Sequence, residues 1–146
     1  MANKDIKKRE LEQLMKGRTE EQKNALKYFY QDKGCIFGHL MTDQEYEQMV
    51  VKMINSTDWK KKALARIGME EEDVQEVRPI HFEGFDYTPK NSLSLYGKDM
   101  KWRSSHYQIS WVFCSATQVY VWQYTFSTID DTKKERTEEY FYKDIT

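Results

Sequence analysis

HYQISWVFC (106–114), SATQ (115–118) and VYVWQYTFS (119–127) follow one another in the chain, and this stretch decides the fold class. Apolar and polar side chains alternate in the first and third segments, which is the pattern of a strand with one buried face. Four small or polar residues separate these segments, as in a hairpin loop. The stretch therefore predicts a β-hairpin whose large aromatic side chains supply most of the core of a sheet.

Working outward from this hairpin, the chain changes character near residue 77. Residues 1–76 are rich in charge and repeat their apolar side chains at helical spacing, whereas residues 77–146 are aromatic and alternate with period two. We therefore predict one α+β domain over residues 1–146, with about four helices packed on a mostly antiparallel sheet of four to five strands. The expected helices cover residues 4–16, 19–33, 42–54 and 58–67, and the expected strands cover residues 77–85, 93–96, the two arms of the hairpin and residues 138–146.

Helix ends carry recognisable signals. Residues 19–22 (TEEQ) and 42–45 (TDQE) match capping boxes, and Thr57 or Asp58 can cap the next helix. Gly34 suits the position that follows a helix, and residues 35–41 are predicted to form a buried connector or a short strand. Pro79 predicts that the first strand begins there or lies at an edge of the sheet.

Composition limits the function classes. The 146 residues carry a net charge of -1, which argues against a general nucleic-acid binder. Cys35 and Cys114 are far apart in sequence, and two free thiols suit a reducing cytosol. No signal peptide is apparent, and no stretch approaches the roughly 18 apolar residues of a membrane helix. We expect a cytoplasmic protein, and the sequence leaves open whether the chain is a fragment of a longer one.

Motifs for catalysis or cofactors are not apparent in the sequence. His39, His81 and His106 show no metal-ligand spacing, and there is neither a phosphate-binding loop nor a dinucleotide fingerprint. We therefore predict no catalytic residue, no metal and no cofactor. One enzymatic alternative stays open: a small hydrolase or transferase in which His81 or His106 meets Cys114 or a carboxylate in a cleft.

The leading hypothesis is a non-enzymatic interaction module. It would dock a partner protein through exposed aromatic side chains or a sheet edge. The residues predicted to bind this partner are Trp102, Trp122, Tyr140 and Tyr142. The last strand could also pair with a second copy of the chain to form a homo-oligomer.

A second hypothesis is recognition of an anionic ligand, either a nucleic acid or a lipid headgroup. It requires basic side chains from separate segments to converge on one surface. The residues predicted for this role are Lys60, Lys61, Lys62, Arg66, Lys101 and Arg103, with further support from the basic first helix.

The last third of the chain resembles bacterial PH-like domains. The resemblance rests on residues 117–126 and 137–146, where YKDIT (142–146) matches a short form Y-x-D-I-T that follows a hairpin and a polar loop in that family. The whole chain is also similar to uncharacterised bacterial proteins with a helical first half and a β second half. A full PH-like domain has further strands and a C-terminal helix that are not present here. The resemblance implies a fold more than a function.

Overall fold

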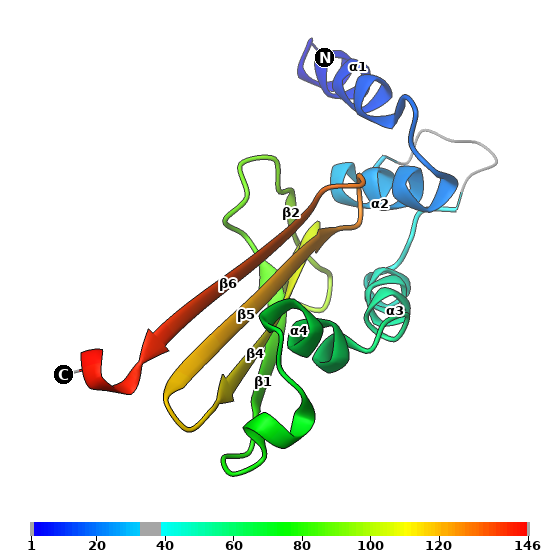
Figure 1. Ribbon diagram of the computed structural model, residues 1–146. Coiled ribbons are helices and arrows are strands. Elements are labelled where there is room, and N and C mark those ends of the chain that lie inside the picture. Colours follow the sequence, from blue (N-terminus) through cyan, green and yellow to red (C-terminus); the bar gives the residue numbers. More distant parts are fainter. Residues whose placement is uncertain (1, 33–38, 146) are drawn as a thin grey trace.

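The computed structural model describes residues 2–32 and 39–145, and helices precede strands along this part of the chain (Figure 1). The helical segments are α1 (Ala2–Met15), α2 (Glu20–Tyr30), α3 (Asp43–Ile54), α4 (Trp59–Ile67) and the 3₁₀ turn η1 (Glu71–Val74). The strands are β1 (Ile80–Asp86), β2 (Ser94–Tyr96), β3 (Trp102–Ser104), β4 (His106–Cys114), β5 (Gln118–Ser127) and β6 (Lys133–Phe141), followed by the 3₁₀ turn η2 (Tyr142–Asp144). The predicted α+β class is confirmed.

Two of the predicted N-caps form as expected. Thr19 Oγ1 accepts from the backbone N–H of Gln22 at 3.1 Å, and the Gln22 side chain accepts in return from the Thr19 N–H at 3.0 Å, which completes the capping box of α2. At α4 the cap is Asp58, whose carboxylate accepts from the Lys61 N–H at 3.1 Å. Both caps satisfy backbone donors that have no partner inside the helix.

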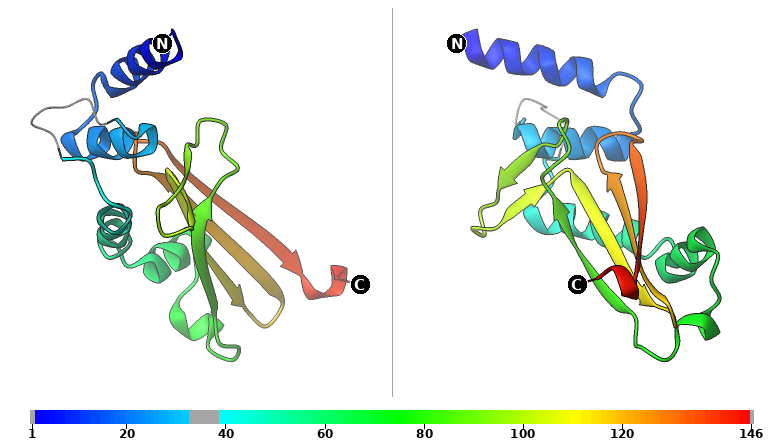
Figure 2. Two further views of the ribbon diagram at one scale, coloured as in Figure 1. Left: turned by 180° about the vertical axis from the view of Figure 1, so that it is seen from behind. Right: turned by 60° about the vertical axis from the view of Figure 1, so that its left-hand side comes forward.

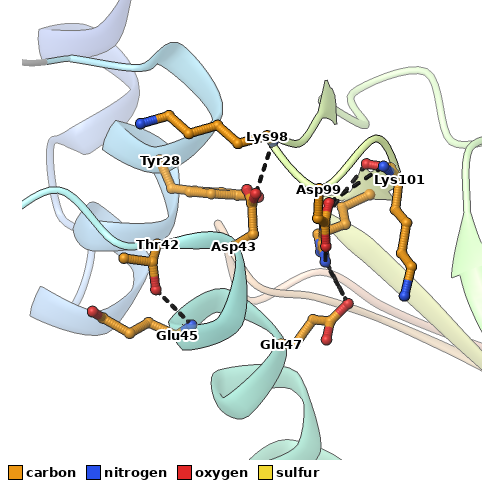
Figure 3. Close-up of polar contacts among 9 residues, drawn as sticks. Tyr28, Thr42, Asp43, Glu45, Glu47, Lys98, Asp99 and Lys101 are labelled. Atoms are coloured by element: carbon orange, nitrogen blue, oxygen red, sulfur yellow. Dashed lines mark hydrogen bonds and ion pairs between the residues drawn. The ribbon is translucent and has the colours of Figure 1, made fainter.

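The cap of α3 is only half of the predicted box. Thr42 Oγ1 accepts from the Glu45 N–H at 3.1 Å (Figure 3). The Glu45 carboxylate contacts the His39 ring at 2.8 Å instead of returning to the cap. The predicted end of α2 near residue 33 is also wrong. Gln31 ends the helix in the left-handed conformation, with φ of 51°. Gly34 lies outside the described residues, and so does most of the connector or strand predicted at 35–41, of which residues 39–41 form no strand.

The main sheet is antiparallel, with strand order β1-β4-β5-β6. The hairpin predicted from residues 106–127 forms its centre, and Trp111 lies opposite Trp122 across the two strands. β1 is an edge strand that begins directly after Pro79, as predicted, because proline has no N–H to contribute to a ladder. The hairpin therefore places the aromatic residues in the middle of the sheet, with one strand added on each side.

The last strand differs from its prediction. β6 covers Lys133–Phe141 instead of residues 138–146, and the chain then turns into η2. The first residues of β6 lie before the predicted strand, because an edge strand in contact with water carries the same charged side chains as a loop. β3 was not predicted at all. It pairs with β2 in a separate small sheet.

Helices α3 and α4 lie on one side of the main sheet in every view (Figures 1 and 2). The Trp59 ring of α4 packs on Tyr124 and Phe126 of β5, with ring centroids 5.0 and 6.1 Å apart. Tyr46 of α3 is fully buried, and its hydroxyl donates to the Ser104 carbonyl at 2.6 Å. The core therefore lies between these helices and the aromatic face of the hairpin.

α1 extends beyond α2, away from the sheet (Figure 2). Leu11 is its buried side chain, and Met15 packs against the core from the last turn. Ile6 is 60% exposed. α1 is therefore attached through a narrow apolar stripe.

Candidate binding face of the sheet

The sheet face away from the helices, here called the open face, changes from polar to apolar along the strands. Side chains alternate between the two faces of a strand. Ile109, Trp111 and Phe113 of β4 lie on the face that the helices cover. The residues between them on β4, together with their partners in register on the other strands, therefore lie on the open face. The successive rows are Asp86 with His106; Gly84 with Gln108, Thr125 and Lys134; Phe82 with Ser110, Gln123 and Arg136; Ile80 with Val112, Val121 and Glu138; and Cys114 with Val119 and Tyr140.

The polar end of the open face contains a cavity of about 320 Å³, here called the His106 cavity. Its lining comes from β1, β4, β5 and β6 and from the loop after β1. The residues that matter for its chemistry are Asp86, Lys90, His106, Gln108, Thr125 and Lys134. Segments that are far apart in sequence therefore meet at one polar recess.

His106 is the least exposed residue that lines this cavity, at 2%. Its Nδ1 lies 2.9 Å from Ser105 Oγ, and this hydroxyl oxygen accepts from the Leu93 N–H at 2.8 Å. Its Nε2 is buried and has no hydrogen-bond partner. Burial lowers the pKa of His106, against the opposing effect of the carboxylates of Asp130 and Asp86. A neutral imidazole with one unused nitrogen therefore borders the cavity.

The charges around the cavity do not cancel. Asp86 Oδ1 already accepts from the Thr88 N–H at 3.0 Å and from the Thr88 hydroxyl at 2.7 Å. Arg136 is paired with Glu138 at 2.7 Å. Lys90 and Lys134 form no ion pair with any residue that the structure describes. The cavity therefore has an excess of positive charge.

The other end of the open face is apolar, and we call Ile80, Phe82, Val112, Val121 and Tyr140 the apolar patch. Ile80 is 56% exposed, Phe82 50% and Tyr140 46%. The Tyr140 hydroxyl donates to the Glu138 carboxylate, which raises the pKa of Tyr140. Isolated apolar side chains are ordinary on a surface, but contiguous ones mark interaction sites.

The four residues predicted to bind a partner do not form one surface. Trp122 is fully buried, and its indole N–H donates to Glu135 at 2.8 Å, so its predicted role in docking is wrong. Trp102 is 58% exposed, but it lies on β3 beside Tyr96, at the end of β4 that is opposite Tyr140. Tyr142 lies in η2, where its hydroxyl donates to the Ser115 carbonyl at 2.8 Å. Of the four, Tyr140 belongs to the apolar patch.

Arg103, which was predicted to bind an anion, is a buried residue that forms ion pairs within the protein. It is 1% exposed, and it donates to Asp99 at 2.8 and 2.6 Å and to Glu47 at 2.7 Å. Hydrogen bonds from Arg103 hold the pKa of Asp99 at about 2, below its usual 3.8. Arg103 is therefore unavailable to a nucleic acid or a headgroup, and its predicted role is wrong.

A second set of hydrogen bonds lies next to Arg103. The Tyr28 hydroxyl donates to Asp43 at 2.7 Å, and the Lys98 N–H donates to the other oxygen of the same carboxylate at 2.8 Å (Figure 3). Burial and the Asp43 carboxylate raise the pKa of Tyr28. Together these contacts hold the turn between β2 and β3 against α2 and α3, which is a structural role.

The basic side chains of α4 are mostly engaged within the protein. Lys60 lies 3.0 Å from Glu71, and Arg66 lies 3.9 Å from Glu135. Lys62 Nζ lies over the Tyr124 ring, 4.3 Å from its centroid. Two other predicted residues, Lys61 and Lys101, are exposed, on α4 and before β3 respectively. The predicted residues therefore do not form a surface with free positive charge.

The three histidines and Cys114 lie apart. His39 contacts Glu45, and His81 contacts Glu83 at 3.0 Å. Cys114 lies eight residues from His106 on β4, which separates them by roughly 27 Å in an extended strand. Ser105 is fully buried and bonded to Nδ1 of His106, while Nε2 has no acidic partner, so the pair lacks the arrangement of an activated nucleophile. The described ranges contain no cluster of metal-binding side chains.

Sequence reasoning missed the His106 cavity, although a signal was present. Gln108, Gln123 and Thr125 are polar at alternating positions of the hairpin, on the face without the large aromatics. Lys134 is polar too, but it belongs to a strand that was expected to begin later.

No family model matches the chain, and no curated protein or solved structure shows a match to it. Within the described ranges, no helix has the length and apolar character needed to cross a membrane.

Proposed function

We propose that the protein is a non-enzymatic binding module that docks a segment of a partner protein on the open face of its sheet. The observation that supports this most directly is the apolar patch, in which Ile80 and Phe82 on one edge strand and Tyr140 on the other are each about half exposed. Val112 and Val121 of the hairpin lie between the two edges. Large apolar side chains gain free energy when a partner removes them from water, at about 25 cal/mol per Å².

Docking on the face is favoured over pairing at the β6 edge. β6 reads KKERTEEYF, and lysines and other charged residues along an edge strand oppose the addition of another strand. Self-association through this strand, which was expected from the sequence, is therefore the weaker proposal. A segment that crosses the open face meets apolar side chains without displacing these charges.

Charge complementarity indicates the chemistry of the partner segment. Along β6, the apolar patch is followed by Arg136, which is paired with Glu138, and then by Lys134, which has no ion pair among the described residues. The positive charge of the open face therefore increases toward its polar end. An acidic side chain near large apolar residues would complement both parts of the face. We therefore assign the partner as a protein segment that combines apolar residues with Asp or Glu.

A displayed library of short random peptides tests this proposal. Phe82→Ser is expected to weaken the selected peptides at least about 30-fold, because removing a central interface side chain costs about 2 kcal/mol or more. Trp102→Ser is the matched control, since Trp102 is equally exposed but lies off the open face. Selected peptides without acidic residues, or with equal loss in both variants, would contradict the assignment.

Two expectations from the sequence stay proposals. Cys114 has a free thiol, which supports placing the protein in the reducing cytosol. The resemblance of the last third to bacterial PH-like domains stays a prediction about fold, and residues 142–144 of its motif form η2 after β6.

A further inference from the structure

We infer that the His106 cavity binds a small organic anion, a carboxylate or a phosphate ester that also carries hydroxyl groups. The cavity contains no residue of the apolar patch, and the inference does not depend on the proposed docking function, although Lys134 and Arg136 serve both proposals. The inference rests on three observations about the cavity: its size, its unpaired cations, and a buried imidazole nitrogen without a partner.

The size of the cavity suits a small molecule. A volume of about 320 Å³ lies at the lower end of the range for small-molecule sites, which is roughly 300–1,000 Å³. Its floor is the hairpin, where Gln108 Nε2 donates to Thr125 Oγ1 at 3.3 Å. Thr88, Pro89 and Lys90 line it from the loop after β1. A ligand would therefore lie on the sheet and touch the loop after β1.

The lysines supply attraction for an anion from two directions. Lys90 comes from the loop after β1, and Lys134 comes from β6, on the far side of the hairpin. Arg136 also lines the cavity and shares its charge with Glu138. Asp86 opposes an anion, but its Oδ1 is already occupied by Thr88. Two unpaired cations therefore outweigh one engaged carboxylate.

His106 adds a directional group. The Ser105 hydroxyl accepts from Leu93, and its own hydrogen can be donated to His106 Nδ1, which places the ring proton on Nε2. A buried polar atom without a partner costs about 1–3 kcal/mol. Nε2 is covered in the structure, so a ligand in the cavity must displace this cover before it accepts from Nε2–H and removes the cost. The site therefore favours an occupant with an oxygen acceptor.

The other residues that line the cavity favour a ligand that carries hydroxyl groups. Gln123 offers both a donor and an acceptor. Asp86 Oδ2 accepts from Thr125 Oγ1 at the long distance of 3.5 Å and has a lone pair left to accept from a hydroxyl. Asp86 therefore disfavours a bare anion but favours one with a neighbouring O–H. This selects hydroxylated carboxylates and sugar-like phosphate esters as the ligand class.

NMR titration of the whole chain tests the assignment. The probes are glycerol phosphate and glycerate, which separate the two sources of negative charge, with glycerol as the neutral control. Either anion is expected to shift the Nε2 resonance of His106 and the amide of Thr125 in a saturable way. The ring signals are assigned with His39→Asn and His81→Asn, which lie outside the cavity.

Adjacent lysines supply the matched variants. Lys134→Gln is expected to weaken binding at least about tenfold, because a hydrogen bond to a charged group is lost. Lys133→Gln removes the same charge from the opposite face of β6 and is expected to retain binding. Both residues are exposed, so neither variant threatens the fold. No saturable shift with either anion, an equal response to glycerol, or equal weakening in both variants would overturn the inference. Phe82→Ser leaves the cavity lining intact, so failure of the docking proposal is recognised separately.

Discussion

Replacing Arg103 by methionine removes the guanidinium that joins Asp99 to Glu47 but keeps an unbranched apolar side chain in its place. Arg103 is 1% exposed and makes a two-pronged contact with Asp99, at 2.8 and 2.6 Å, and a contact with Glu47 at 2.7 Å. Hydrogen bonds between charged groups contribute about 1.5–3 kcal/mol each when desolvated. The two carboxylate side chains are 39% and 47% exposed, so water recovers part of the loss. We therefore expect Arg103→Met to lower the free energy of unfolding by about 2–3 kcal/mol.

Urea unfolding followed by tryptophan fluorescence measures this loss. With a slope of about 2 kcal/mol/M, the midpoint should fall by about 1–1.5 M. Arg103→Lys keeps the charge but loses the planar guanidinium group, which contacts two carboxylates at once. Its midpoint should therefore lie between those of the parent chain and Arg103→Met. Lys101→Met is the control, because it removes an exposed charge nearby. An Arg103→Met midpoint equal to that of the parent chain would refute the claim that the buried ion pairs of Arg103 stabilise the fold.

The same cluster gives two further predictions. Because hydrogen bonds from Arg103 lower the pKa of Asp99 from 3.8 to about 2, its contribution to stability is complete above pH 4 and is lost as the pH falls toward 2. Unfolding measured across this range should show a steeper loss in the parent chain than in Arg103→Met, and equal slopes would contradict the pairing. Gly97→Ala should lower the melting temperature, because a Cβ there would lie 2.6 Å from Arg103 Nη1, 2.7 Å from Asp99 Oδ1 and 2.8 Å from Asp43 Oδ2. Crowding of this kind costs about 1–3 kcal/mol, and an unchanged melting curve would show that the cluster adapts freely.

The parts of the fold that depend on neighbours in sequence were predictable. The hairpin follows from alternation within residues 106–127, and the caps at Thr19 and Asp58 follow from side chains that reach three residues along the chain. The start of β6 was not predictable, because an edge strand with charged side chains has the composition of a loop. Local sequence patterns therefore predict the type of an element well, but they predict the ends of an exposed edge strand poorly.

The candidate site and the ion-pair cluster depend on contacts between distant residues. Arg103 and Glu47 are 56 positions apart, so a basic residue that suggested a surface for anions is in fact buried by a partner elsewhere in the chain. The face shared by Trp122 could be read from alternation, but its burial depends on where α4 packs. The His106 cavity likewise needs the ends of several strands to meet, which no single stretch of sequence shows.

The packing of α4 on the hairpin has a consequence for how the protein folds during synthesis. Trp59 is translated well before Tyr124 and Phe126, the rings on which it packs. The apolar side of α4 therefore has no cover until β5 has been made. Strands β4, β5 and β6 are neighbours both in sequence and in the sheet, and contacts of this local kind form quickly. Because the rings that cover Trp59 belong to β5, the packed position of α4 requires the second half of the chain to be present.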